Sequence, residues 1–408
     1  MLAIASEVDA RDAKFRSSIA LFELVPTSED RVDDDVPEYP TLVSKPRDPS
    51  SKNGPFIPFS ALSGLASACP FGVKWFEDNG GCKENILYTI EDSFYNKNRI
   101  LTIDTSTFPA VITSEMRIMD SDSILTDCLQ GNIGDGVDVS SIVNKDMTVN
   151  IDPEGIAVST KGGFWIVSEG KGTVGDKSKP FETPNLLLKV TDDAKITECT
   201  MLPKDGSFLD QSRYGFEGVA EDGDRVIITI QREWGDESNP RIAVYDTSAE
   251  TWKYAFYPLD EPESQNDGWV GLADIAPVGG GKFLVLERDN QFGPDAAIKK
   301  IYAIDLGDYS FEDGKTVTKS LEKDLMGDLK KSNGQVFEKV EGLAVSKSGS
   351  IWFNNDNDGV DGNSGEQALL NVGTYSSPTA APKKKQKKKS KKDSKKIKPK
   401  KPKKETKK

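Results

Sequence analysis

Short apolar runs recur along the chain, and most of them close on an acidic residue. Clear copies occupy 163–169, 225–230 and 350–356, and degenerate copies occupy 86–92 and 282–289. The runs are rich in β-branched and aromatic residues, and no i, i+3, i+4 period typical of a helix occurs along the chain. The pattern therefore predicts five repeats built from β-strands.

Each run follows a second phrase in which an acid or its substitute precedes Gly-x-Ala. The phrase is clear at 152–157, 215–220 and 339–344 and degenerate at 63–66 and 273–276. Further strand-like runs come downstream, as at 99–104, 185–190, 241–246 and 300–305, with more polar ones at 196–201 and 252–257. Four antiparallel strands per repeat, spaced roughly 50 to 70 residues apart, are typical of propeller blades. We expect an all-β β-propeller of five or six blades, whose crowded axis alone explains the Gly and Ala.

The repeats define the expected domain organisation. We expect an N-terminal extension over 1–16, a propeller over 17–373, a Pro/Ser/Ala linker over 374–382 and a Lys-rich tail over 383–408. The last repeat stops after 368–372, so the apolar run 18–24 is expected to supply an outer strand to it.

Charge separates the tail from the body. The chain has 53 Lys+Arg and 66 Asp+Glu, of which 383–408 holds 17 Lys and 2 acids, leaving the body with 36 basic and 64 acidic residues and a net charge near -28. Such a body repels polyanions unless cations bridge it, which fits divalent-cation binding and argues against nucleic-acid contact by the propeller. A solubility role for the acids is the other interpretation.

The tail has no apolar period and is expected to be disordered. Its Lys clusters suit diffuse attraction to a polyanion, an anionic surface or a mineral. Nuclear targeting and docking on the chain's own acidic body remain open alternatives.

Histidine is absent from the sequence. A Ser-His-Asp triad, a His general base, a phosphohistidine and a His-ligated zinc are therefore excluded within this chain. Hydrolysis would need a water activated by a hard cation on carboxylates, and calcium fits best because it accepts many oxygen ligands in a flexible shell.

The candidate ligands form two rings if the blades align. The inner-strand glutamates are expected to be both catalytic and metal-binding. An inner-strand aspartate and the acids that end the next strand are expected to be metal-binding only, unless they only face water or pair with Arg. The first ring is Glu154, Glu217 and Glu341, joined by Asp274 if Ala276 takes the Ala position of its blade. The second ring is Glu91 or Asp92, Glu169, Glu233, Glu287 and Asp356. Asp358 follows as a further metal-binding candidate in an acidic loop, whose spacing of acids does not match that of an EF-hand. Arg232 and Arg288 lie beside this ring and are candidates for binding phosphate.

The order of these motifs resembles the phytase-like family, also described as having esterase-like activity of phytase. The resemblance runs from about residue 60 to about 372 and rests on the phrases at 62–65, 153–157, 215–220, 283–289 and 340–344 with the acidic loop 355–358. It implies a propeller that hydrolyses phosphorylated or ester small molecules. A non-catalytic binding propeller and a lactonase or other carboxylester hydrolase are the alternatives.

Four cysteines allow three pairings, and a disulfide between Cys69 and Cys82 would staple a long insertion in the first repeat. Cysteine use favours an extracellular or secretory location, although 1–11 lacks a signal-peptide core of adequate length, and the Lys-rich tail allows the nucleus. We expect a monomer without a transmembrane segment.

Overall fold

The structure is a computed structural model, in which the residues up to Tyr375 form one compact unit and Ser376–Lys408 a second. It describes residues 2–5, 19–22, 41–48, 50, 54–78, 82–203, 208, 211, 213–264, 266, 268–311, 315–331, 336–360 and 367–376. The Lys-rich tail, most of the expected linker and most of the N-terminal extension lie outside the described residues.

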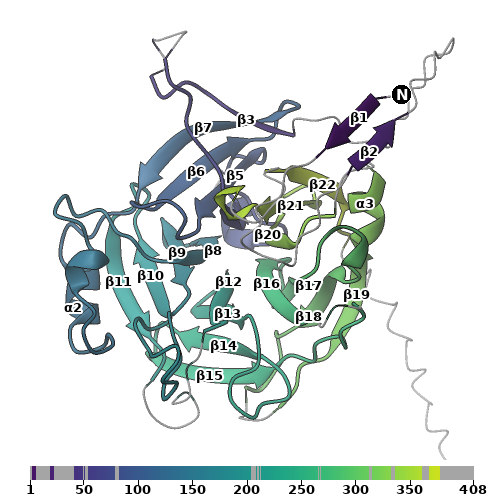
Figure 1. Cartoon of the computed structure of the whole chain (residues 1–408). Helices are drawn as coiled ribbons and strands as arrows, with labels where there is room; N and C mark the ends of the chain where they lie inside the picture. The colour runs from purple at the N-terminus through teal and green to yellow at the C-terminus, as the bar shows by residue number, and fades with distance from the viewer. Residues whose placement is uncertain are drawn as a thin grey trace, which may run out of the picture. The chain divides into compact units, whose positions relative to one another are not determined.

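Five antiparallel sheets stand around a common axis, so the chain folds as a five-bladed β-propeller (Figure 1). The first sheet contains β4 (Leu62–Ser67), β5 (Ile86–Glu91), β6 (Arg99–Asp104) and β7 (Ala110–Arg117), with β3 (Leu42–Ser44) added in parallel to β7. The second contains β8 (Pro153–Val158), β9 (Phe164–Ser168), β10 (Leu186–Val190) and β11 (Ile196–Met201). The third contains β12 (Phe216–Asp222), β13 (Arg225–Ile230), β14 (Arg241–Asp246) and β15 (Thr251–Phe256).

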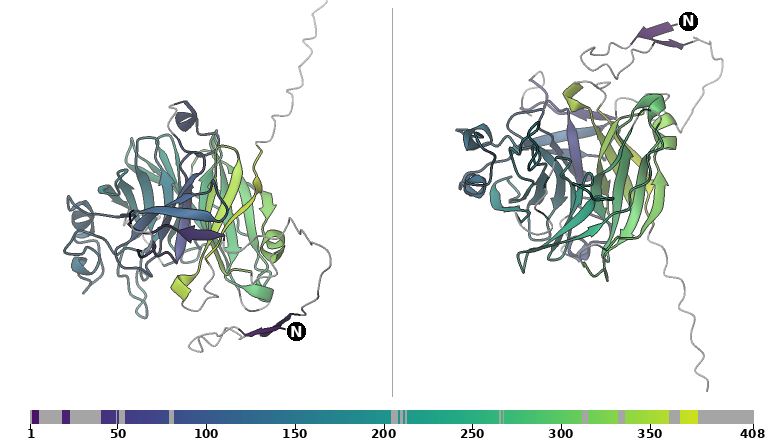
Figure 2. Two further views of the ribbon diagram at one scale, coloured as in Figure 1. Left: turned by 90° about the horizontal axis from the view of Figure 1, so that it is seen from above. Right: turned by 60° about the horizontal axis from the view of Figure 1, so that its bottom comes forward.

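The fourth sheet contains β16 (Val270–Pro277), β17 (Lys282–Asp289), β18 (Lys299–Asp305) and β19 (Lys319–Asp324). The fifth contains β20 (Lys339–Val345), β21 (Ser350–Asp356) and β22 (Leu369–Thr374). Helices α1 (Lys74–Asp78), α2 (Ile124–Leu129) and α3 (Met326–Lys331) and the 3-10 turns η1 (Val139–Ser141), η3 (Gly293–Asp295) and η4 (Asp358–Val360) lie in the connections. Figure 2 shows α2 at the outer side of the ring in both further views.

The hydrophobic core is divided among the interfaces between neighbouring blades. Ile90 and Ile100 of the first blade pack with Ile156 and Ile166 of the second, for example. Four further clusters fill the interfaces of the second with the third blade, the third with the fourth, the fourth with the fifth, and the fifth with the first. Because sheets buried on both faces need apolar residues on both faces, the strands read as near-continuous apolar runs.

The inner strands approach one another so closely that glycine is required. A Cβ placed on Gly155 would lie 2.3 Å from the carbonyl oxygen of Glu217, and one on Gly64 would lie 2.6 Å from that of Glu154. The register of every inner strand also shifts beside this position, which is the mark of a β-bulge. The repeated phrase therefore lies where neighbouring inner strands come into closest contact.

The run 18–24 does not supply an outer strand to the last blade, so this prediction was wrong. Its described part, β2 (Ile19–Phe22), pairs with β1 (Leu2–Ala5), and the fifth sheet has three strands among the described residues. Alternation of apolar residues predicts a strand but not its partner, and a second short apolar run is available nearby in sequence.

Side-chain hydrogen bonds join the first and last blades instead. Asn357 Oδ1 accepts from Ser60 Oγ and from the Ala61 N–H, both at 2.7 Å, and Asn354 Nδ2 donates to the carbonyl oxygens of Leu62 and Ser63 at 2.8 Å. Among the described strands, none is shared between the first and last blades.

The cysteines form two disulfides, Cys69–Cys82 and Cys128–Cys199. The second joins α2 to β11 and fixes the insertion between the first and second blades against the outer edge of the second. Among the described residues, no helix has the length and apolar character needed to cross a membrane.

Candidate functional site

The strand registers define two equivalent positions per blade at the axis. Ala66, Ala157, Ala220, Ala276 and Ala344 pair with equivalent residues of the second strands, so Ala276 takes the Ala position as expected. Counting back from these alanines, the inner position holds Ser63, Glu154, Glu217, Ala273 and Glu341. The residue just before each inner position pairs with one residue of the second strand, and the next residue along that second strand defines what we call the ring position. The ring position holds Asp92, Glu169, Gln231, Arg288 and Asp356.

This alignment moves several expected ring members by one residue. Asp274 occupies the place of the glycine rather than that of the acid, and Glu287 is one residue short of the ring position, which Arg288 fills. In the first blade the ring residue is Asp92, because Glu91 points into the sheet and binds Arg99. In the third blade it is Gln231, while Glu233 lies beyond it and pairs with Arg232 at 2.7 Å.

Asp274 links three blades near the axis through hydrogen bonds. Its carboxylate accepts from the N–H groups of Leu343 at 2.7 Å and Leu65 at 3.2 Å, on the fifth and first blades, and from its neighbour Ile275 at 2.8 Å. Burial raises the pKa of Asp274 to about 8 despite these three donors. A carboxyl with all these bonds to backbone acts as a structural tie across the ring.

The three inner glutamates have different partners. Glu154 Oε2 accepts from Ser63 Oγ at 2.7 Å, Glu217 accepts from the amide of Gln231, and Glu341 Oε1 accepts from Arg288 Nη2 at 2.5 Å. Arg288 is only 3% exposed, so its guanidinium is committed to Glu341. Burial, together with repulsion by Glu217 and Asp152, raises the pKa of Glu154 well above its usual value.

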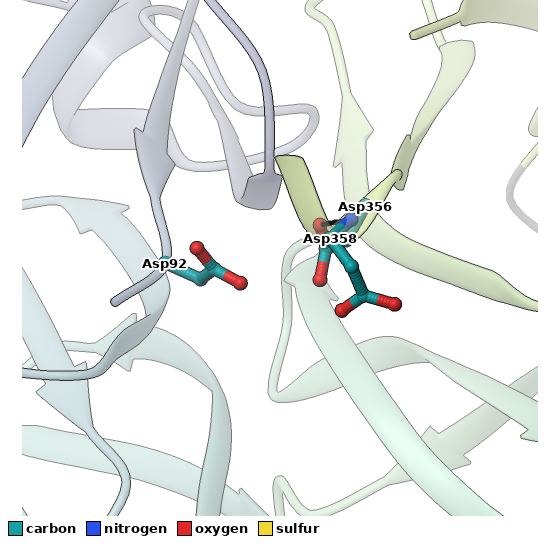
Figure 3. Close-up of side chains that lie close together, drawn as sticks. All are labelled: Asp92, Asp356 and Asp358. Carbon is teal, nitrogen blue, oxygen red and sulfur yellow. Dashed lines mark hydrogen bonds between the residues drawn. The ribbon is translucent and has the colours of Figure 1, made fainter. Parts of the chain in front are cut away.

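A first carboxylate cluster lies where the fifth blade meets the first. Asp92, Asp356 and Asp358 each offer an oxygen within 4.8 Å of the others, and Figure 3 shows Asp92 facing the pair from across a gap. Lys339 Nζ binds Asp356 at 2.9 Å and also pairs with Asp358. Burial raises the pKa of Asp92 to about 8 and that of Asp358 to about 6. The ammonium of Lys339 thus supplies a positive charge to this cluster.

A second cluster, which we call the blade 2 cluster, consists of Asp152, Glu154 and Glu169. Their oxygens also lie within 4.8 Å of one another. Glu169 accepts from the N–H groups of Tyr214 and Gly215, and burial followed by the charge of Asp152 raises its pKa to about 7. Burial raises the pKa of Asp152 as well. Within the described part of the chain, none of the three forms a salt bridge, so these carboxylates are held together against their own repulsion.

We call the end of the propeller that carries the two carboxylate clusters and the inner glutamates its mouth. Arg232 lies beside this mouth on the third blade. Its guanidinium stands 4.9 Å from the ring centroid of Trp269 and 5.6 Å from that of Tyr214. Glu287, by contrast, is fully buried in a network on the fourth blade, where it accepts from Lys319 Nζ and from the Asp260 N–H, each at 2.7 Å. The structure therefore brings Glu154, Glu169, Glu217, Glu341, Asp356 and Asp358 to the mouth and leaves Glu287 within its blade.

The axis is closed below the carboxylates. Leu65, Ile156, Val219, Ile275 and Leu343, one from each inner strand, line a hollow of about 20 Å³, which is room for about one water molecule. An open cleft of about 670 Å³ instead runs outward over the second blade. Its walls carry Asp152 and Glu169 together with Lys171, Lys179 and Arg213.

Sequence reasoning missed Asp152, Lys339, Gln231 and Arg213. Asp152 and Lys339 each lie two residues before the inner-strand glutamate, Glu154 or Glu341, but an acid in one copy and a base in another do not look equivalent. Arg213 lies in the loop before β12, outside the repeated phrase, and the sequence carries no signal for its place in the cleft.

Comparison with known proteins supplies a family. The family model described as Phytase-like, esterase-like activity of phytase, matches residues 77–359, which include the acids at the mouth. No curated protein matches the chain.

Solved structures with a similar course of chain are distant. They include a luciferin-regenerating enzyme (10% identity, 78% of this chain and 80% of that chain, TM-score 0.37) and the major allergen Mala s 1 of Malassezia sympodialis (10% identity, 76% and 77%, TM-score 0.36). A β-fructofuranosidase of Bombyx mori is also similar (10% identity, 76% and 60%, TM-score 0.37). These similarities are too low to bear on the activity of the chain.

Proposed function

The chain belongs to the phytase-like family, and on this premise we propose that it is a calcium-assisted phosphoester hydrolase that works at the mouth of the propeller. The observation that supports calcium is the blade 2 cluster, in which Asp152, Glu154 and Glu169 stand within 4.8 Å of one another without a salt bridge among the described residues. Clustered carboxylates whose pKa values are raised by burial and mutual repulsion are stabilised by a cation.

The donor set fits the proposed ion. Calcium takes hard oxygen ligands in a flexible shell, and the blade 2 cluster offers three carboxylates from two strands' ends beside an open cleft. A buried acceptor nearby also lacks a partner, since Glu341 Oε2 receives no hydrogen bond from the described residues. Calcium bound at Asp152, Glu154 and Glu169 would polarise a phosphoryl oxygen and a water molecule.

The remaining residues would bind phosphate and move the proton. Arg213 and Lys179, on the wall of the same cleft, would neutralise phosphate oxygens. We assign proton transfer from the attacking water to Glu217, whose carboxylate lies beside Glu154 and whose pKa burial and the charge of Glu341 raise well above its usual value. The water oxygen would bond to phosphorus as the bond from phosphorus to the ester oxygen breaks, and Glu217 would pass the proton that it took from water to the leaving alkoxide. Glu341 would act as a positioning residue that holds Arg288.

Replacing single carboxylates tests this proposal. Glu154→Gln and Glu217→Gln keep the shape of the side chain but remove its charge, so each should lower kcat for a phosphoester by about 10²-fold or more. The matched control is Glu198→Gln on the outer strand β11, which is exposed and should leave turnover unchanged. The measurement is hydrolysis of a panel of phosphoesters and carboxylesters, each with calcium and with chelator.

The same panel separates the alternatives. Turnover like that of the wild type in both glutamine variants would remove these carboxylates from the mechanism. Cleavage of carboxylesters alone would favour the lactonase or carboxylester hydrolase alternative, and binding of calcium without cleavage of any ester would favour a binding propeller.

A further inference from the structure

The cleft over the second blade borders on a second hollow of about 810 Å³. The first hollow, which we call the acidic compartment, holds Asp152 and Glu169; the second we call the apolar compartment. Val137, Pro180, Glu182 and Pro184 line both compartments, so the two lie next to each other. A ligand that crosses these shared residues would contact both.

The lining changes character from one compartment to the other. Most side chains of the apolar compartment are apolar, namely Ile133, Val137, Val174, Phe181, Met201 and Leu202, and the acids Asp135 and Glu182 also line it. Val174 is 46% exposed, which is unusual for a large apolar side chain and leaves it available for contact. The acidic compartment instead carries Lys171, Lys179 and Arg213 beside its carboxylates, which suits an anionic group bridged to a cation.

A buried acceptor in the apolar compartment lacks a partner. Gln211 lines this compartment and is 7% exposed, and its Oε1 receives no hydrogen bond from any described residue. Its Nε2 faces the carbonyl oxygen of Leu202 at 3.5 Å. An unsatisfied buried acceptor costs free energy unless a ligand brings a donor.

The walls of the cleft are tied to one another. Gly134 N–H donates to the carbonyl oxygen of Glu182 at 2.8 Å, and Val174 N–H donates to that of Gln211 at 3.2 Å. The Cys128–Cys199 disulfide holds the α2 insertion that precedes Ile133. The cleft is thus built from three loops that are cross-linked through backbone and disulfide bonds.

We propose that this cleft binds an amphiphilic phosphoester, with its phosphate in the acidic compartment and an apolar substituent in the apolar compartment. A hydroxyl or amide N–H on that substituent would donate to Gln211 Oε1. The substrate class rests on the proposed function, because the phosphate is placed where hydrolysis would occur. The apolar compartment determines which phosphoesters bind best.

Equilibrium binding of a ligand series tests the proposal without requiring turnover. Methyl-, butyl- and octylphosphonate, which cannot be hydrolysed as esters, are titrated calorimetrically in calcium, and octanol serves as the uncharged probe. Each methylene buried in the apolar compartment should strengthen binding up to about fourfold, the equivalent of about 0.8 kcal/mol. Val174→Ser should weaken octylphosphonate binding several-fold and leave methylphosphonate unchanged. The matched control is Leu321→Ser, at an apolar residue on β19 that is 56% exposed, and it should change neither.

The outcomes distinguish this inference from the proposed function. Equal affinity for methyl- and octylphosphonate, an unchanged chain-length dependence in Val174→Ser, or octanol binding as tight as octylphosphonate would each overturn the inference. Hydrolysis of methyl phosphate without any chain-length dependence would overturn it while supporting the proposed function. Chain-length-dependent binding without hydrolysis of octyl phosphate would support the binding site while contradicting the proposed function.

Discussion

At the scale of single residues, the mouth holds several carboxyl groups close enough to repel one another when ionised. Glu154 has Glu217, Asp152, Asp92 and Glu169 as neighbours that raise its pKa, after burial as the first cause. Lys339 relieves the cluster on the fifth blade directly, through Asp356 and Asp358. No salt bridge to the blade 2 cluster occurs among the residues that the structure describes, although the charge of Lys339 lowers the pKa values of Asp152 and Glu169 in part. If calcium binds there as we propose, the ionisation of the cluster is coupled to calcium binding.

This coupling predicts how stability depends on pH. The pKa of Glu169 is raised from 4.5 to about 7, so the folded state holds a proton that the unfolded state loses, and stability in chelator should fall as pH rises from about 4.5 through about 7. Calcium should oppose this loss by binding the ionised folded state, and its stabilising effect should be larger at pH 8 than at pH 5.

The measurement is the Tm by calorimetry at pH 5, 6, 7 and 8, with chelator and with millimolar calcium. Glu169→Gln should flatten the decline in chelator, since its amide does not titrate, whereas the exposed Glu198→Gln should not. A calcium shift of Tm that is absent at every pH would contradict cation binding by the blade 2 cluster.

At the scale of elements, the inner strand with its bulge is the unit that the repeats encode. The acid-Gly-x-Ala phrase predicted the inner strands correctly because close approach at the axis demands glycine in four of the five blades, at Gly64, Gly155, Gly218 and Gly342. Glu154, Glu217 and Glu341 were found by that phrase. Gln231 and Arg288 were not, because the position after the second strand tolerates acid, amide and base, and only the register reveals its equivalence.

Strand pairing was the part that the sequence could not determine. The run at 18–24 has the apolar character of an outer strand, but its described part pairs with β1, since hydrogen bonding along a strand edge is not specific for one partner. The end of the second strand was also misplaced by one residue, which is why Glu287 rather than Arg288 was expected in the ring.

The glycine requirement gives a prediction for the elements. Gly155→Ala should destabilise the fold by about 3 kcal/mol, because the added Cβ would lie 2.3 Å from a backbone oxygen of β12 that is fixed by its own sheet. Gly327→Ala in α3 is the matched control, as nothing lies within 4 Å of its added Cβ and alanine favours a helix by up to about 1 kcal/mol. Chemical denaturation measures both, and equal stability of the two variants would mean that the inner strands can separate freely.

At the scale of the whole molecule, side-chain hydrogen bonds join the first and last of the five blades, and no described strand is shared between them. Asn354 and Asn357 of the last blade bind the backbone and side chain of the first, and Leu369 N–H donates to Thr41 Oγ1 at 3.0 Å. Closure therefore depends on a few buried hydrogen bonds and on the apolar interface between these blades.

Asn357→Ala tests this closure. The change would leave the Ser60 hydroxyl and the Ala61 N–H without their acceptor, so the free energy of unfolding should fall by about 2 to 4 kcal/mol. Asn371→Ala on the exposed side of β22 is the control and should cost less than about 1 kcal/mol. Denaturation by urea gives the comparison, and a loss in Asn357→Ala no greater than that in the control would assign closure to the apolar interface alone.

The charges of the chain predict a role for the tail. Deleting 383–408 removes 17 Lys and 2 acids, and it should leave folding and any hydrolysis unchanged while weakening salt-dependent binding to an anionic resin. Elution of full-length and truncated protein across a salt series is the measurement. Identical elution profiles would contradict tethering to a polyanion and favour docking of the tail on the acidic body.

Apolar side chains fill the axis below the mouth of the propeller. Leu65, Ile156, Val219, Ile275 and Leu343 line a hollow of only about 20 Å³ below the carboxylates, which is room for about one water molecule. A reactant must enter, and its products must depart, by the same face. Any molecule bound over that face should compete with substrate, whatever its chemistry. A bulky label attached to the opposite face should leave substrate binding and product release unchanged.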